Sequence, residues 1–345
     1  MTVGNGKLFT LFPQLGSTIT VTDASPLSGL RPPAPGPMYL TGPTASGKSA
    51  VGLELALRIG AEIISLDSMA VYRGMNIGTA KPSAAEQKLV AHHLIDIVDP
   101  WEDFSVAQYL DRAHEVVRAV QSRGRQPLFV GGTPLYLKAL LRGLFSGPAA
   151  DWNLRSELAE IARQEGSAEL HRRLAASDPV AAAKLHPNDT RRLIRALEVF
   201  QHTGRPISEL QQQFDKPPAG KSLANQSPTV FVLDWPREQL CRRIDDRVEA
   251  MFAAGLVDEA HSLIAGGRNP SRTAVQALGY REVLAHLAGK YDLASTIDLV
   301  KLHTRQFAKR QLTWFRSLAE CRFVAVSDSF DPAEIAARIT IEANP

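Results

Sequence analysis

The stretch "YLTGPTASGKSA" at residues 39–50 decides the fold class of this chain. Gly42 and Gly47 enclose four residues and are followed by Lys48 and Ser49, which is the P-loop pattern G-x-x-x-x-G-K-[ST]. A short β-rich run precedes the pattern and a helical run follows it, as a P-loop requires. The pattern predicts that backbone N–H groups and Lys48 hold a diphosphate, with Ser49 as a ligand of Mg2+. The predicted diphosphate-binding residues are Gly42, Pro43, Thr44, Ala45, Ser46, Gly47, Lys48 and Ser49.

The sequence around this loop alternates strand-like and helix-like segments. Amphipathic stretches of helix length separate short apolar runs, and one such stretch begins with the capping pair Ser105 and Gln108 and ends at Gly124. Alternation of this kind is typical of βαβ units, so we expect an α/β fold with a P-loop kinase-like core built on a parallel sheet. The apolar runs predict strands at residues 38–41, 61–66, 93–98, 127–132, 228–235 and 322–327.

The alternation stops at residues 147–215, where the hydrophobic period is helical throughout. We interpret this segment as an inserted all-helical domain. Residues 38–146 and 216–345 would then form the α/β core, with a largely helical C-terminal part. Residues 1–37 are rich in proline, which prevents helix and sheet, so we expect a disordered extension there. A true start of the protein at Met38 is an alternative explanation of this extension.

Composition excludes several classes of protein. The chain has 345 residues, of which 44% are hydrophobic and 22% are charged, and this favours a globular fold with a full core. A net charge of only +3 means that any affinity for nucleic acid must come from local basic clusters. The two cysteines, Cys241 and Cys321, are too few for a disulfide framework or a zinc site. We expect a monomer that works in the cytoplasm and does not bind a membrane.

Two polar residues follow predicted strands on either side of the loop. Asp67 could accept a proton from a nucleophile or hold magnesium through water, although a helix N-cap would explain it too. Thr133 precedes Pro134, which is typical of an N-cap followed by proline at the first helical position. These residues leave two reactions open: phosphoryl transfer from ATP, and displacement at carbon with diphosphate as the leaving group.

Seven segments follow one another in fixed order: "GPTASGKS", "ISLDSMAVYRGMNIGTAKP", "HHLIDIVDP", "VGGTPLYLKALLRGL", "LHPNDTRRLIRALEVF", "QALGYRE" and "TRQFAKRQLTWFR". In this order they resemble the motifs of bacterial tRNA dimethylallyltransferases, also called tRNA isopentenyltransferases. The resemblance implies transfer of a dimethylallyl group from dimethylallyl diphosphate to N6 of the adenosine just 3′ of the anticodon of tRNA, with Mg2+ as cofactor. Ser49 stands where threonine is commoner in the family, and either hydroxyl can ligate magnesium.

The resemblance also assigns roles to single residues. It makes Asp67 the group that takes the proton from the adenine amine and places Thr133 at the reacting end of the complex. It makes Arg247 a candidate diphosphate ligand, which could equally be an exposed helix arginine. Lys81 matches a family motif without an assigned role. The tRNA contacts implied are Asp67, Ser68, Met69, Ala70, Thr133, Arg155, Arg191, Arg192, Leu193, Ile194 and Arg195.

Basic residues also recur near the C-terminus, where Lys301, Arg305, Lys309 and Arg316 form one helical stripe. They could contact RNA phosphates or form an ordinary solvated face. Two alternatives to prenyl transfer remain at this point: a small-molecule or nucleotide kinase, and an RNA-binding ATPase switch. For the pair His92 and His93 we favour a structural role over metal binding, because neither has a partner at ligand spacing.

Overall fold

The computed structural model describes residues 36–145, 147–211, 230–265, 267–327 and 329–343. The expected disorder of the N-terminal extension therefore lies outside the described residues, except for Gly36 and Pro37. Within the described ranges, no helix is both long enough and apolar enough to cross a membrane.

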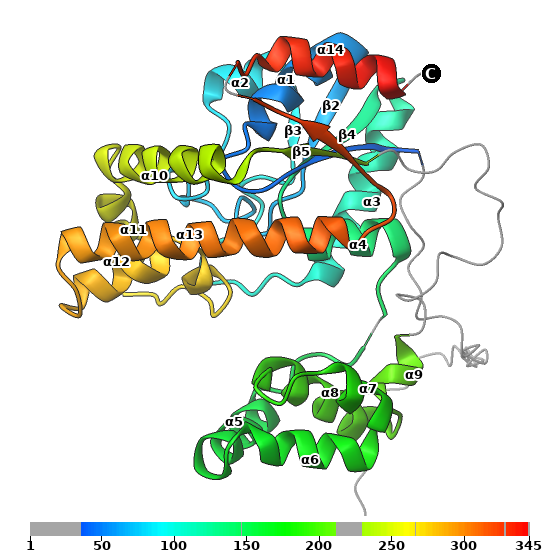
Figure 1. Cartoon of the computed structure of the whole chain (residues 1–345), viewed down its shortest axis with the longest axis vertical. Coiled ribbons are helices and arrows are strands. Elements are labelled where there is room, and N and C mark those ends of the chain that lie inside the picture. Colours follow the sequence, from blue (N-terminus) through cyan, green and yellow to red (C-terminus); the bar gives the residue numbers. More distant parts are fainter. Residues whose placement is uncertain (1–35, 146, 212–229, 266, 328, 344–345) are drawn as a thin grey trace, which may run out of the picture.

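The core of the molecule is one six-stranded sheet in the order β3-β2-β4-β1-β5-β6, in which every pairing is parallel. This confirms the predicted α/β fold class. Helices cover both faces of the sheet, and Figure 1 shows α1 and α14 above it and α3 and α4 below it. The strands are β1 (Met38–Thr41), β2 (Ala61–Ser65), β3 (His92–His93), β4 (Gln126–Gly131), β5 (Val230–Asp234) and β6 (Cys321–Ala325).

Neighbouring residues of the central strands face opposite layers, and both layers are buried. Tyr39 of β1 packs with Phe129 of β4 under α3 and α4, whereas Leu40 packs with Val51 of α1 on the other face. Parallel strands covered on both faces are hydrophobic almost throughout, as these are.

The core helices before the insertion are α1 (Lys48–Ile59), α2 (Ala84–Leu89), α3 (Val106–Ser122) and α4 (Pro134–Arg142). Those after it are α10 (Arg237–Ala253), α11 (Leu256–Ala265), α12 (Tyr280–Leu287), α13 (Leu293–Arg316) and α14 (Pro332–Ala343), with a 3-10 turn η3 (Ala274–Gln276).

Local signals in the sequence set some element bounds correctly. Helix α3 begins after Ser105, whose hydroxyl accepts from the N–H of Gln108 while the Gln108 side chain accepts from the N–H of Ser105. The predicted strand at residues 93–98 is wrong over most of its length, since β3 contains only His92 and His93. Leu94 and Asp96 have φ angles of 59° and 53°, which turn the backbone out of the extended conformation.

Between α4 and β5 the described chain is helical. Its helices pack around a small core of their own that includes Leu158, Leu170, Leu174 and Val199. Figure 1 shows this group (green) at the bottom of the view, below α4 and α13 and away from the sheet. The helices are α5 (Trp152–Glu165), α6 (Ser167–Ser177), α7 (Pro179–Lys184), α8 (Thr190–Thr203) and α9 (Ile207–Leu210).

The ends of β2 and β4 approach each other closely just beyond the sheet. The N–H of Leu66 donates to the Val130 carbonyl at 2.9 Å, and the N–H of Thr133 donates to the Leu66 carbonyl at 3.1 Å. A Cβ atom on Gly131 would overlap that carbonyl group of Leu66. Glycine is therefore required at residue 131, and its absence of a side chain brings the residue after Leu66 next to Thr133.

We expect Gly131→Ala to lower the free energy of unfolding by about 1–3 kcal/mol, because backbone must move to admit the methyl group. Chemical denaturation would measure this loss. Gly52→Ala is the comparison variant: its new methyl would lie 2.8 Å from a methyl group of Val130, a side chain that shifts more easily than backbone, and alanine is the better helix former. An equal loss in the two variants would contradict the argument.

Candidate functional site

The P-loop lies between β1 and α1. Gly47 is the N-cap of α1, with a φ of 82°, and Ala45 also has a positive φ, of 63°. Residues 43 to 46 form a tight turn, in which the N–H of Ser46 donates to the Pro43 carbonyl. At the helix end, the N–H groups of Gly47, Lys48 and Ser49 have no acceptor among the described residues. These free donors at a helix N-terminus suit an anionic ligand.

Side chains from the C-terminal half of the core hold the loop from behind. Trp235 Nε1 donates to the Ser46 carbonyl at 2.9 Å, and Arg243 Nε donates to the Ala45 carbonyl at 3.0 Å. The Arg243 guanidinium lies over two adjacent rings, 4.3 Å from the centroid of Trp235 and 5.0 Å from that of Phe330. Fixing the carbonyls outward keeps the N–H groups pointing inward. The sequence offered no pattern that would have identified these three supports.

In front of the loop is a cavity of about 740 Å³. It brings together residues from the carboxyl ends of β1, β2 and β4, which is where ligands bind in open α/β sheets. The cavity also reaches α10, α13 and the helical segment. The residues that the sequence predicted for the site and that line this cavity are Thr44, Lys48, Ser49, Asp67, Ser68, Met69, Ala70, Thr133, Arg191 and Arg247.

Two half-buried cations face one carboxylate in this cavity. Burial is the main cause that lowers the pKa of Lys48, to about 8, and the nearby charge of Arg247 lowers it further while Asp67 opposes the shift. Burial also lowers the pKa of Arg247, against the opposing charge of Asp67. The interpretation of Arg247 as an exposed helix arginine is therefore wrong. A site that holds two poorly solvated cations against one carboxylate has an excess of positive charge that a diphosphate would neutralise.

Asp67 and Thr133 are connected through Ser68, which follows Asp67 in the chain and bonds to Thr133. Asp67 Oδ1 accepts from the N–H groups of Met69 and Ala70, at 2.8 and 3.3 Å, and Oδ2 has no donor among the described residues. Thr133 is the N-cap of α4 by position, but its hydroxyl does not bond to that helix. The hydroxyl instead accepts from the Ser68 N–H at 3.0 Å, so the predicted N-cap position of Thr133 is confirmed while its side chain serves the neighbouring segment.

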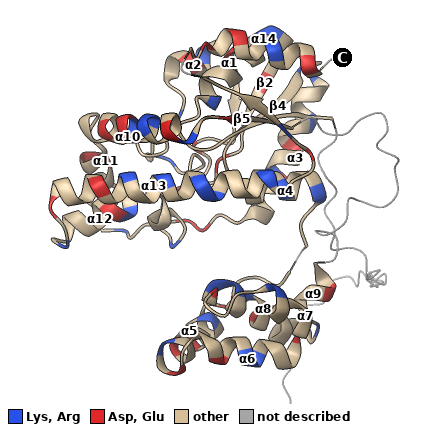
Figure 2. Ribbon diagram, viewed as in Figure 1, with Lys and Arg blue, Asp and Glu red and all other residues tan. Residues whose placement is uncertain are grey.

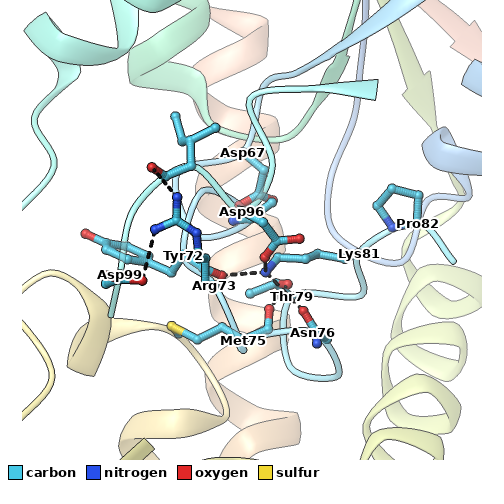
Figure 3. A network of polar contacts seen from close by, with 12 residues as sticks. Asp67, Tyr72, Arg73, Met75, Asn76, Thr79, Lys81, Pro82, Asp96 and Asp99 are labelled. Atoms are coloured by element: carbon cyan, nitrogen blue, oxygen red, sulfur yellow. Dashed lines mark hydrogen bonds and ion pairs between the residues drawn. The ribbon is translucent and has the colours of Figure 1, made fainter. Parts of the chain in front are cut away.

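The segment that carries Asp67 is fixed at its far end by Lys81, as Figure 3 shows. The side chain of Lys81 is 3% exposed, and Nζ donates to the Tyr72 carbonyl and to Asp96 Oδ1, both at 2.5 Å. Asn76 Oδ1 accepts a third bond at 3.1 Å. On the other side, the Glu259 carboxylate accepts from the N–H groups of three consecutive residues, 76 to 78. Lys81 thus holds together the segment between Asp67 and α2, a role that the sequence did not reveal.

The arginines predicted to contact tRNA fall into two groups. Arg191 is exposed and borders the cavity. Arg155 and Arg195 instead bind the fully buried carboxylate of Glu198, with Arg155 Nε 2.8 Å from Oε1. Arg192 pairs with Asp189 at 3.1 Å and stays largely exposed. Leu193 and Ile194 are buried in the core of the helical segment, so their side chains do not face a ligand.

The C-terminal basic stripe is mostly an intramolecular contact. Lys301 pairs with Glu249 at 2.6 Å and Arg305 with Asp245 at 2.5 Å, and both carboxylates belong to α10. Arg316 lies 3.7 Å from Asp234. Figure 2 shows acidic and basic positions along the neighbouring helices α10 and α13. These pairs join α13 to its neighbours, which favours the structural interpretation of the stripe over an RNA surface.

The remaining candidates for metal chemistry have ordinary roles. His93 Nε2 lies 2.7 Å from Glu62 Oε2, as expected for a structural histidine. Cys241 and Cys321 are free, half-buried thiols. The described part of the chain holds no group of three or more His, Cys, Asp or Glu residues that could bind a metal. A magnesium ion here would therefore have to share its ligands with phosphate oxygens and water, which is common for Mg2+.

Comparison with known proteins gives a consistent result. The family model described as IPP transferase matches residues 70–318. The tRNA dimethylallyltransferase of Desulforudis audaxviator is 49% identical over 302 residues, covering 88% of this chain and 96% of that protein. That of Geobacter metallireducens is also 49% identical, over 85% of this chain and 94% of its own length.

Solved structures agree with these relatives. The tRNA isopentenylpyrophosphate transferase of Bacillus halodurans is 40% identical with a TM-score of 0.64, and the match covers 89% of this chain and 95% of that one. A eukaryotic dimethylallyltransferase acting on tRNA is 27% identical with a TM-score of 0.72, over 88% of this chain and 77% of that one. The chain belongs to the IPP transferase family, together with the bacterial tRNA dimethylallyltransferases.

Proposed function

We propose that this chain transfers a dimethylallyl group from dimethylallyl diphosphate to N6 of the adenosine just 3′ of the anticodon of tRNA, and releases diphosphate. The observation that carries the proposal is the cavity in which the P-loop and the two half-buried cations, Lys48 and Arg247, face Asp67 and Thr133. A prenyl diphosphate donor needs the P-loop and the cations. A nucleophile that must lose a proton needs Asp67 and Thr133. Membership of the family supports the same reaction.

The phosphate side of the cavity stabilises the leaving group. As the bond between the allylic carbon and the diphosphate oxygen breaks, negative charge grows on that oxygen. Lys48 and Arg247 are already desolvated, so their attraction for this charge is stronger than it would be in water. The open N–H groups of Gly47, Lys48 and Ser49 add fixed dipoles at the same place. No phosphate is transferred in this reaction, which distinguishes it from that of a kinase.

The other side of the cavity prepares the nucleophile. The N6 amine of adenine attacks the allylic carbon and becomes cationic unless it loses a proton. Asp67 accepts that proton through Oδ2, since Oδ1 is held by the N–H groups of Met69 and Ala70. Thr133 and Ser68 fix the position of this segment beside the amine. After the reaction a new C–N bond joins N6 to the dimethylallyl group, Asp67 holds the proton, and diphosphate has left.

Magnesium is proposed as the cofactor of the diphosphate. Ser49 is exposed in the first turn of α1 and borders the cavity together with Asp67. A hydroxyl and a carboxylate, acting directly or through water, suit an ion whose other ligands are phosphate oxygens. When bound, the ion would neutralise part of the charge on the leaving group.

We propose that the helical segment, with Arg191 at the cavity, holds the anticodon arm of tRNA. An adenosine in a loop is easier to unstack than one in a duplex, so the base can enter the cavity at small cost. We also propose that the protein acts as a monomer in the cytoplasm.

Asp67→Asn tests the proton transfer. We expect transfer of label from dimethylallyl diphosphate to tRNA, measured in a single turnover without ATP, to slow by roughly 10²–10⁴-fold. The amide keeps an oxygen for Met69 and Ala70, so tRNA affinity should remain within about threefold. Retention of transfer within tenfold would argue against Asp67 as the base. A requirement for ATP in the unchanged protein would instead favour the kinase alternative.

The charge of Lys48 predicts a pH dependence. Because the pKa of Lys48 is lowered to about 8, the free protein loses this positive charge as the pH rises above 8. We expect KM for dimethylallyl diphosphate to rise by up to tenfold between pH 8 and 9. The kcat should change little, since bound diphosphate favours protonated Lys48. In Lys48→Arg the guanidinium stays charged, so KM should be flat over this range. A flat KM in the unchanged protein would refute the assignment.

Arg191 and Arg155 should behave differently when changed to alanine. Arg191→Ala should weaken tRNA binding and reduce the slope of log K against log salt by about 1, with no change in Tm. Arg155→Ala should lower the free energy of unfolding by about 1–3 kcal/mol, because the buried carboxylate of Glu198 loses one partner. Filter binding and calorimetry measure the two effects. The same effect in both variants would contradict the division of these arginines into an RNA contact and an internal partner of Glu198.

A further inference from the structure

The turn at residues 76–78 is bound to a carboxylate from the C-terminal half of the core. Glu259 of α11 accepts from the N–H groups of all three residues, at distances between 2.9 and 3.3 Å. Tyr280 of α12 donates its hydroxyl to Oε1 of the same carboxylate at 2.5 Å. Successive N–H groups that converge on one anion form an anion-binding turn, and here the anion belongs to the protein itself. Glu259 therefore fixes the turn to α11 and α12.

Close packing also holds this turn against the two helices. A Cβ atom on Gly78 would lie 2.3 Å from the ring of Tyr280 and 3.0 Å from Leu256 Cδ1. Tyr280 is 1% exposed and Leu256 is fully buried. Packing and hydrogen bonds thus restrict the turn to one position, as a part that positions others must be.

A continuous chain of hydrogen bonds leads from the turn to Asp67. Asn76 Oδ1 accepts from Lys81 Nζ at 3.1 Å, and Nζ also donates to the Tyr72 carbonyl. The N–H of Tyr72 donates to the Met69 carbonyl at 3.2 Å. The N–H of Met69 in turn donates to Asp67 Oδ1 at 2.8 Å. Figure 3 shows Asn76, Lys81, Tyr72 and Asp67 in this arrangement.

The chain ends on the oxygen of Asp67 that does not act as the base. Because Oδ1 is held by backbone N–H groups, the position of that backbone sets the direction of Oδ2. A base must lie within hydrogen-bond distance of the proton that it removes, so a displacement of about 1 Å slows the transfer. Glu259 is not among the residues that line the cavity, so it would act on the reaction through this chain.

We propose that Glu259 is a positioning residue for Asp67, which acts through the turn at residues 76–78 and Lys81. The inference rests on the proposed function, since it takes Asp67 as the base. It assigns a part in the reaction to a residue of α11, a helix far from Asp67 in the sequence. A purely structural role of Glu259 would weaken folding, whereas a positioning role lowers kcat and depends on the presence of the base.

Glu259→Gln tests the proposal on the full chain. The new amide group keeps one oxygen, but its NH2 group faces N–H donors, so the turn is released. We expect kcat for prenyl transfer at saturating tRNA to fall by roughly 10–100-fold. KM for tRNA and for dimethylallyl diphosphate should stay within about threefold. In the Asp67→Asn background the same change should add less than about twofold, because the group that is positioned is already lost.

Asp178→Asn is the matched control. The Asp178 carboxylate also accepts from two backbone N–H groups and one hydroxyl, those of Ala181 and Ser208. It lies in the helical segment and does not line the cavity. Its loss should therefore lower the free energy of unfolding and leave kcat unchanged.

A second variant cuts the chain without changing the carboxylate. Asn76→Ala keeps the backbone N–H for Glu259 and removes the acceptor of Lys81. We expect kcat to fall by about three- to tenfold, so the proposal remains testable if Glu259→Gln does not fold. Hydrogen exchange needs no activity, and the amides of Met69 and Ala70 should exchange faster in both variants.

Two results would overturn the proposal: fully additive losses of kcat in Asp67→Asn and Glu259→Gln, or a kcat and amide exchange that both variants of the chain leave unchanged. Absence of prenyl transfer by the unchanged protein would instead reject the proposed function. Hydrogen exchange would then still decide whether Glu259 holds the segment of Asp67 in place.

Discussion

The close contact between the backbone of Leu66 and Gly131 is the constraint on which the site depends. It joins the carboxyl ends of β2 and β4 through the hydrogen bonds of Leu66 and Thr133. Any side chain at Gly131 would separate these ends. Because β4 pairs with β1, the same contact sets the distance from Asp67 to the P-loop. Backbone packing at one glycine thus fixes the distance between Asp67 and the P-loop.

Electrostatics then gives the cavity its chemical character. Burial makes the positive charges of Lys48 and Arg247 costly, and the single carboxylate of Asp67 compensates only in part. Behind the loop, Trp235 and Arg243 donate to its carbonyl groups, so these supports add no anion to the site. An unsatisfied cationic site is preorganised for a ligand whose negative charge grows during the reaction.

In the helical segment, charge serves two purposes that look alike in sequence. Glu198 is buried and draws Arg155 and Arg195 inward, which fixes α5 to α8. Arg191 projects from the same helix α8 toward the cavity. A cluster of arginines on one helix therefore contains both internal partners and a candidate RNA contact, and only the position of the buried carboxylate separates them.

The sequence by itself determined the P-loop, five of the six strands, the capping box of α3 and the positions of Asp67 and Thr133, because each depends on neighbouring residues. Tertiary structure alone decided that Arg247 faces the cavity, that the Thr133 hydroxyl bonds to Ser68, and that β3 ends at His93. The contact of Thr44 with Gln311 joins residues 267 positions apart. Contacts at such separation arise from the packing of whole helices on the sheet, and no local pattern of residue types records them.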